Sequence, residues 1–300
     1  EYDMRARKMT LLKQTEVLGD YDPSQYVSER LFATAADGTR IAISLVRRRD
    51  LDPAGENPMV LYGYGAYGHP LPVGFSSSRL SLLDRGITCA VAHVRGGGEM
   101  GKEWHDAGRM ERKRNSFADF IAVAEHLIAI GATASDSLVI SGASAGGLLI
   151  GAVLNERPEL FAGAVLHVPF VDVINTMSDP SLPLTVGEYL EWGNPNLETE
   201  YRWMRAYDPY LNIRRADYPP MLVHTSLNDS QVMYWEAAKY VARLRDRKTD
   251  SNPLLLKMNL AGHGGASGRY DLLREEVFDV AFILQQLGRA GEACGESRAS

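Results

Sequence analysis

One stretch near the middle of the chain, residues 138–150, restricts the possible folds more than any other. An apolar, β-branched run enters a Gly-x-Ser-x-Gly turn, and small and apolar residues leave it. This order predicts a strand, a sharp turn and a helix, with the hydroxyl of Ser144 exposed at the carboxyl edge of a parallel sheet. Such a turn excludes bulky side chains at Gly142 and Gly146. An ordinary serine in a glycine-rich turn is the alternative, and the strand before and helix after favour an exposed nucleophile.

Strands and helices are expected to alternate along most of the chain. Asp37-Gly38 predicts a hairpin between the first two strands. This alternation predicts an α/β fold with a doubly wound, mostly parallel sheet and a leading antiparallel hairpin. Residues 169–210 are predicted to be irregular. The expected strands cover residues 29–35, 40–47, 58–62, 87–94, 138–143, 162–168, 221–225 and 254–258; helices are expected after Ser144 and at 117–130, 232–247 and 271–287.

The chain divides into one large domain and two flanking segments. A hydrophobic share of 45% in 300 residues is enough for a sizeable core. We expect residues 1–25 to form a connecting arm, residues 26–287 the α/β domain and residues 288–300 a mobile tail. The sequence starts at Glu1 rather than Met, so it is expected to be a portion of a longer protein.

Charge and composition make several classes of partner unfavourable. The formal charge of −6 and the lack of a Lys/Arg block argue against nucleic acid. No apolar stretch reaches the ~18 residues of a membrane span, and no signal-peptide pattern is present, so no membrane association is expected. Cys89 lies in an apolar run and Cys294 in a polar tail, which predicts free thiols and a reducing, cytoplasmic location.

A serine nucleophile needs a base and an acid that orients the base. In this kind of fold the chain order is Ser, then acid, then His, each on a loop that follows a strand. Downstream of Ser144, one predicted strand leads into Asp229 and the next leads into a glycine-rich loop with His263. We therefore predict a triad of Ser144, Asp229 and His263. Other candidates fit less well: His93, His167 and His224 belong to apolar strand runs typical of core histidines, and Asp179, Asp208 and Asp217 follow no strand in this way.

Two glycine-rich loops could be mistaken for phosphate-binding motifs. Residues 63–68 match Gly-x-Gly-x-x-Gly, but the two prolines that follow prevent the helix that a dinucleotide site requires. After this strand a hydrolase places its second oxyanion donor, and a tyrosine hydroxyl can serve. Residues 95–99 lack the Lys-Ser/Thr end of a phosphate loop and predict a structural turn. Neither His-Glu-x-x-His nor paired cysteines occur, so we expect no metal and no cofactor.

Several motifs together resemble the catalytic domain of the prolyl oligopeptidase family. The resemblance runs from the first residues to about residue 287, and residues 187–195 and 227–232 resemble the oligopeptidase B branch in particular. It implies a serine peptidase of the α/β-hydrolase fold that cuts short peptides after Arg or Lys. It also implies an N-terminal β-propeller that restricts substrate size and to which residues 1–25 would connect. The motifs are residues 62–68, 94–99, 144–149, 187–195 and 262–265.

The resemblance also assigns roles around Ser144. It implies the Tyr64 hydroxyl and the Ala145 N–H as oxyanion donors, Tyr67 as a wall of the specificity pocket and Glu188 as the partner of a basic substrate side chain. Oligopeptidase B enzymes usually have a second acid where this chain has Leu190, which we expect to weaken binding of basic substrates and to add an apolar wall. If this segment is extended, Glu191 lies on the opposite face. A surface ion pair is the alternative role of Glu188.

Further alternatives concern the residue after which the chain would cleave and the class of protein to which it belongs. Prolyl oligopeptidase itself uses an arginine where this chain has Gln231, which argues against cleavage after proline. A carboxylesterase of the same fold would share the triad and would prefer an apolar acyl pocket. A binding domain would have lost at least one triad member, and all three are present in this sequence.

Overall fold

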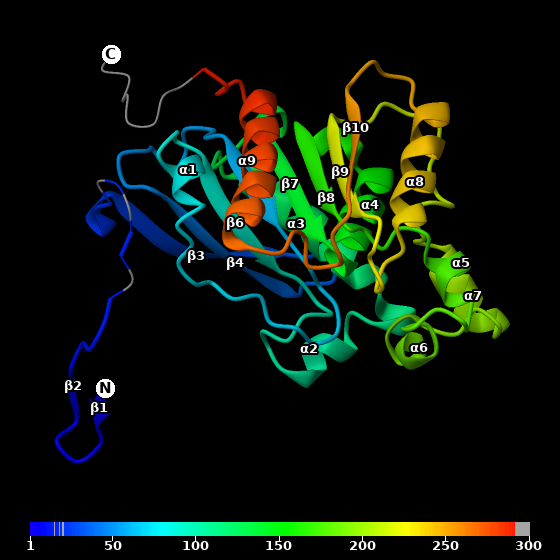
Figure 1. Cartoon of the computed structure of the whole chain (residues 1–300), viewed down its shortest axis with the longest axis horizontal. Helices are drawn as coiled ribbons and strands as arrows, with labels where there is room; N and C mark the ends of the chain where they lie inside the picture. The colour runs from blue at the N-terminus through cyan, green and yellow to red at the C-terminus, as the bar shows by residue number, and fades with distance from the viewer. Residues whose placement is uncertain (15, 18, 20, 292–300) are drawn as a thin grey trace.

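An eight-stranded sheet forms the centre of the computed structural model, which describes residues 1–291 except 15, 18 and 20 (Figure 1). The strand order is β10-β9-β8-β7-β5-β6-β4-β3, in which the six strands from β10 to β6 are parallel and β4 and β3 are antiparallel. This confirms the predicted α/β fold and its leading hairpin. The strands are β3 Tyr26–Thr34, β4 Arg40–Arg48, β5 Met59–Tyr62, β6 Thr88–His93, β7 Leu138–Ala143, β8 Gly163–His167, β9 Met221–Ser226 and β10 Leu254–Asn259.

Helices cover both faces of the sheet, because side chains alternate along each strand. On β7, Leu138 and Ile140 join a core cluster with α3, α4 and α8, whereas Val139 joins a second cluster with α1 and α9. On α3 the buried apolar residues include Phe117, Phe120 and Leu127, whereas on α9 the buried residues are Phe282, Ile283 and Leu284. The helices in these two clusters are α1 Leu80–Leu83, α3 Arg114–Ala129, α4 Ala145–Glu156, α8 Tyr234–Arg247 and α9 Arg269–Gln286.

The stretch predicted to be irregular, residues 169–210, contains three short helices and one 3-10 turn. The prediction was wrong because helices of four to eight residues are too short to show a clear apolar period. In α7, for example, only Met204 is buried. The remaining helical elements are α2 Lys102–Asp106, α5 Val173–Met177, α6 Tyr189–Trp192, α7 Glu198–Arg205, η1 Pro23–Gln25, η2 Met110–Arg112, η3 Ser135–Ser137, η4 Pro158–Leu160 and η5 Val186–Glu188.

The N-terminal arm extends away from the sheet (Figure 1). It contains a small hairpin of β1 Tyr2–Asp3 and β2 Lys8–Met9, and its apolar side chains are exposed, with Met4 at 83% and Leu11 at 74%. The tail prediction falls mostly on residues 292–300, which together with Cys294 lie outside the described residues. Cys89 is a free thiol. Among the described helices, none combines the length and hydrophobicity needed to cross a membrane.

The turn after β6 is structural, as predicted. Arg95 forms a buried, bidentate ion pair with Asp119 on α3, with N···O distances of 2.6 and 2.9 Å. Its remaining NH₂ group donates to Asp37 at 2.6 Å. Asp37 lies in the β3–β4 turn, where Gly38 has a positive φ of 84°. Arg95 therefore joins the leading hairpin, the turn and α3.

We expect Asp119→Asn to lower the free energy of unfolding by about 3–5 kcal/mol, because it removes the buried charged partner of the Arg95 guanidinium and leaves only the exposed partner, Asp37. Asp37→Asn is the matched control, since it removes the exposed partner of the same guanidinium and should cost less than about 1 kcal/mol. Urea denaturation of the two variants measures both values. If both variants lost the same free energy of unfolding, burial of the Arg95–Asp119 pair would not be the reason for its contribution to stability.

Candidate active site

Ser144 lies at a sharp turn between β7 and α4, as the motif predicts. Its φ of 56° and ψ of −118° are strained for a residue with a side chain. The surrounding backbone is so close that a Cβ on Gly142 would lie 2.3 Å from the Gly146 carbonyl oxygen, and one on Gly147 would lie 2.4 Å from Pro169. The small residues therefore permit the turn that raises the Ser144 hydroxyl above the sheet.

Asp229 and His263 meet at the same edge of the sheet, on the loops after β9 and β10. The imidazole Nδ1 of His263 lies 2.7 Å from Asp229 Oδ2. The Asp229 side chain is fully buried, and its other oxygen accepts hydrogen bonds from the backbone N–H groups of Gln231 and Val232. Because a carboxylate only accepts, Nδ1 carries the proton and Nε2 is available as a base.

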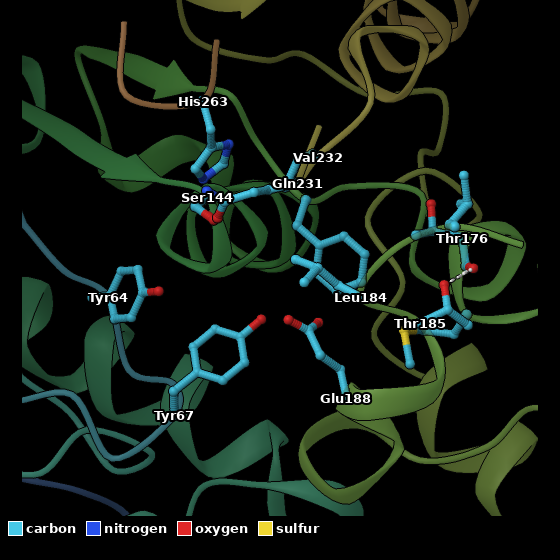
Figure 2. Close-up of a pocket in the computed structure, with 13 residues that line it drawn as sticks. Tyr64, Tyr67, Ser144, Thr176, Leu184, Thr185, Glu188, Gln231, Val232 and His263 are labelled. Atoms are coloured by element: carbon cyan, nitrogen blue, oxygen red, sulfur yellow. Dashed lines mark hydrogen bonds between the residues drawn. The ribbon is translucent and has the colours of Figure 1, made fainter. Parts of the chain in front are cut away.

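Ser144 and His263 line one cavity, and Figure 2 shows the imidazole ring beside the serine hydroxyl. The cavity has a volume of about 450 Å³, large enough for a side chain and the adjoining backbone of a peptide. Its wall is partly apolar and partly polar. The lining residues are Tyr64, Tyr67, Ser144, Phe170, Thr176, Met177, Leu182, Leu184, Thr185, Glu188, Gln231, Val232 and His263.

Two hydrogen-bond donors are available near Ser144. Tyr64, on the loop after β5, points its hydroxyl into the cavity (Figure 2). Burial raises the pKa of Tyr64 to about 12, so the phenol keeps its proton at neutral pH and can donate. Ala145 is the first residue of the twelve-residue α4, where helix N–H groups lack intrahelical acceptors. The geometry can therefore stabilise an oxyanion formed next to Ser144.

Tyr67 and Glu188 form the far wall of the cavity, with the phenol oxygen and the carboxylate facing each other in Figure 2. Burial raises the pKa of Glu188, although Trp192 Nε1 donates to this carboxylate at 2.9 Å and acts in the opposite direction. Burial also raises the pKa of Tyr67, with the Glu188 charge adding to the effect. A partly buried carboxylate in an otherwise uncharged wall is suited to a cationic side chain.

The loop that carries Tyr64 and Tyr67 is held by residues that the sequence did not reveal. Glu191 is buried, and it accepts from the Tyr67 N–H at 2.9 Å and lies 2.6 Å from His105 Nε2. Lys113 is also buried and donates to the carbonyl oxygens of Gly65 and Gly108. Burial lowers the pKa of Lys113 to about 8. No sequence pattern marks the contacts of Glu191 with Tyr67 and His105 or of Lys113 with Gly65, because each joins segments far apart in the chain.

Two expectations about the segment after Glu188 are corrected. The segment is helical in η5 and α6 rather than extended, so Glu191 turns toward the Tyr67 loop. Leu190 is 73% exposed and is not part of the cavity wall, so the expected apolar wall was wrong. Its carbonyl oxygen accepts from Arg109, which fixes the backbone while the side chain faces outward.

Comparison with known proteins agrees with this architecture. The profile of the prolyl oligopeptidase family matches residues 73–290, which is well over half of the chain. The chain belongs to the prolyl oligopeptidase family. The resemblance of its motifs is thereby confirmed, and the fold is that of the family's solved catalytic domains.

Individual similar proteins include two curated peptidases and a solved oligopeptidase B. "Dipeptidyl aminopeptidase BI" of Pseudoxanthomonas mexicana is 48% identical over 97% of this chain, and "Protease 2" of Moraxella lacunata is 47% identical over 94%. The structure of oligopeptidase B from Trypanosoma brucei with covalently bound antipain superposes with a TM-score of 0.93 at 49% identity over 96% of the chain. The chain spans only 40–41% of the length of these three proteins.

Proposed function

We propose that this chain is the catalytic domain of a serine oligopeptidase that hydrolyses short peptides, preferentially after Arg or Lys. The observation that carries this proposal is one cavity that combines Ser144 and the Asp229–His263 pair with a partly buried carboxylate, Glu188. The relatedness to oligopeptidase B supports the same reaction class. No cofactor is needed for it.

The chemistry proceeds through an acyl-enzyme. Ser144 Oγ attacks the scissile carbonyl carbon while its proton moves to Nε2 of His263, and Asp229 stabilises the resulting imidazolium. The Tyr64 hydroxyl and the Ala145 N–H stabilise the oxyanion. When the tetrahedral intermediate collapses, the C–N bond breaks and His263 donates the proton to the leaving amine. Water then attacks the ester by the same sequence of proton transfers and releases the acid.

Glu188 supplies the preference for a basic side chain. A guanidinium entering between Tyr67 and Glu188 would exchange water for a charge-assisted, bidentate pair, which arginine forms better than lysine. Glu188 is the one carboxylate among the cavity-lining residues of the described structure, and one carboxylate offsets less of the desolvation cost of a cation than two would. Gln231, which lines the same cavity, carries no positive charge to repel such a substrate.

Two further parts of the proposal concern an N-terminal domain and the location of the protein in the cell. An N-terminal β-propeller attached through residues 1–25 would restrict substrate size, and the exposed apolar side chains of that arm, such as Met4 and Leu11, are suited to cover by another domain. The upstream reading frame tests this: repeats of four short strands should precede Glu1. A cytoplasmic location is proposed because Cys89 is a free thiol and a reducing compartment keeps it so.

A comparison of amide and ester substrates tests the proposed reaction. An Arg-arylamide should be hydrolysed efficiently by the full-length protein, and a Phe-arylamide much less so. A carboxylesterase of this fold would instead cleave a short-chain ester and leave the arylamides intact. That second result would overturn the peptidase proposal, whereas equal cleavage of both arylamides would overturn only the specificity.

We expect Tyr64→Phe to lower kcat on the Arg-arylamide by about 10²–10³-fold, because it removes one oxyanion donor worth roughly 2.7–4 kcal/mol in the transition state. KM should change little, since the donor acts on the charge that develops during the reaction. Steady-state kinetics of this variant beside Tyr62→Phe, a phenol on the preceding strand outside the cavity, separate the oxyanion role from a general effect of losing a hydroxyl. A change in KM alone would contradict the assignment.

A further inference from the structure

Two histidines outside the active site share one face of the sheet. His167 on β8 and His224 on β9 are paired in register, so their side chains point to the same side, toward α9. The two rings stack with centroids 4.8 Å apart.

Asp279 on α9 completes a cluster with these rings. Its two carboxylate oxygens lie 2.6 Å from His224 Nε2 and 3.3 Å from His167 Nε2. The three ligand atoms all lie within 4.8 Å of one another. His224 Nε2 and Asp279 Oδ1 are both buried and contact each other directly, so a bound metal ion would replace this contact.

We propose that His167, His224 and Asp279 form a binding site for a transition-metal ion of the Zn²⁺ class, with water at the open position. Two imidazoles and one carboxylate are a ligand set that Zn²⁺ accepts. Ligand atoms about 2.0–2.1 Å from a tetrahedral ion lie roughly 3.4 Å apart, close to the 3.3 Å between His167 and Asp279. A small rotation of the carboxylate would open the shorter contact.

A lysine lies on the strand next to the cluster. Lys257, the register partner of His224 on β10, places its ammonium group over the ring of Phe278 at 4.2 Å. This ammonium group therefore contacts an aromatic face.

An ion at this site would join three elements that support the active site. The carbonyl oxygen of His167 accepts from the Ser144 N–H, at the turn itself. One helical turn before Asp279, Glu275 accepts from Ala266 N–H and Asn259 Nδ2, at the two ends of the loop that carries His263. Metal binding would therefore fix α9 to β8 and β9 and stabilise the position of that loop. Zn²⁺ binding at this site does not depend on the proposed peptide reaction or on its specificity.

Calorimetric titration of the tag-free, chelator-stripped full-length protein with ZnCl₂ tests the proposal. We expect one equivalent to bind, Co²⁺ to give visible d–d absorption at the same stoichiometry, and Zn²⁺ to raise the melting temperature. His167→Gln and Asp279→Asn should each weaken binding by more than about 10-fold and remove the thermal shift, since each deletes one ligand.

His126→Gln, which changes an imidazole on α3 in another part of the structure, is the matched control and should bind as the unmodified protein does. His167 is partly exposed, so His167→Gln opens no core cavity, and circular dichroism checks its fold. The proposal is overturned if the unmodified protein binds no equivalent of Zn²⁺ or Co²⁺. It is also overturned if the ligand variants bind as tightly as His126→Gln does.

Discussion

Ser144→Ala is expected to abolish hydrolysis of an Arg-arylamide, with kcat reduced by about 10⁵-fold or more, because the acyl-enzyme cannot form without the nucleophile. Only the contribution of the oxyanion donors and of substrate binding should remain. The fold should be unchanged, since alanine fits the same turn and keeps the hydrogen bonds that the backbone of Ser144 makes. Single-turnover kinetics at high enzyme concentration measure the residual rate.

Ser141→Ala is the matched control for this prediction. Ser141 lies three residues earlier on β7, outside the cavity lining, so its loss should change kcat less than about twofold. A Ser144→Ala variant that keeps more than a hundredth of the activity would show that another group attacks the substrate. The mechanism proposed for the triad would then be wrong, while the fold would stand.

Glu188→Gln is expected to reduce the ratio of kcat/KM for Arg over Phe substrates by about 10²–10³-fold, because truncating one partner of a buried charge pair costs 2–5 kcal/mol. The Phe substrate should be affected little, so the change is in specificity rather than in catalysis. Glutamine keeps the acceptor for Trp192 Nε1 and therefore preserves the wall of the cavity. A substrate series with Arg, Lys, Phe and Pro before the scissile bond measures the ratio.

Leu190→Glu serves as the control for position. Because Leu190 is 73% exposed and outside the cavity, adding a carboxylate there should leave the Arg-to-Phe ratio of the described domain unchanged. An unchanged ratio in Glu188→Gln would show that Glu188 is not the specificity residue. A sharpened ratio in Leu190→Glu would show that the side chain at this position reaches the substrate in the full-length protein.

Local sequence determines the parts of the site that could be predicted. The strand, glycine turn and helix around Ser144 are adjacent in the chain, and the order of Asp229 and His263 follows from strands that are themselves predictable. The structure places these last two in contact through Nδ1 and Oδ2 at 2.7 Å. Parallel strands end at one edge of the sheet, so loops distant in sequence meet there.

The support of the site could not be predicted, because it depends on contacts between distant segments. Glu191 bonds the Tyr67 backbone across 124 positions of sequence, and Lys113 bonds the Gly65 carbonyl across 48. A charged residue is expected at the surface unless its partner is known. For the same reason the contacts of Asp279 with His167 and His224 could not be predicted, and both histidines were expected to be ordinary core residues. The helices after β8 were missed because they are short.

Active-site labelling with a fluorophosphonate, followed by peptide mapping, tests the central claim most directly. The reagent reacts only with a serine that a neighbouring base activates inside an oxyanion site. We predict stoichiometric modification of the full-length protein at Ser144, and loss of labelling when His263 is replaced by alanine. Modification at a different serine, or no modification of the folded protein, would contradict the assignment of Ser144 as the nucleophile.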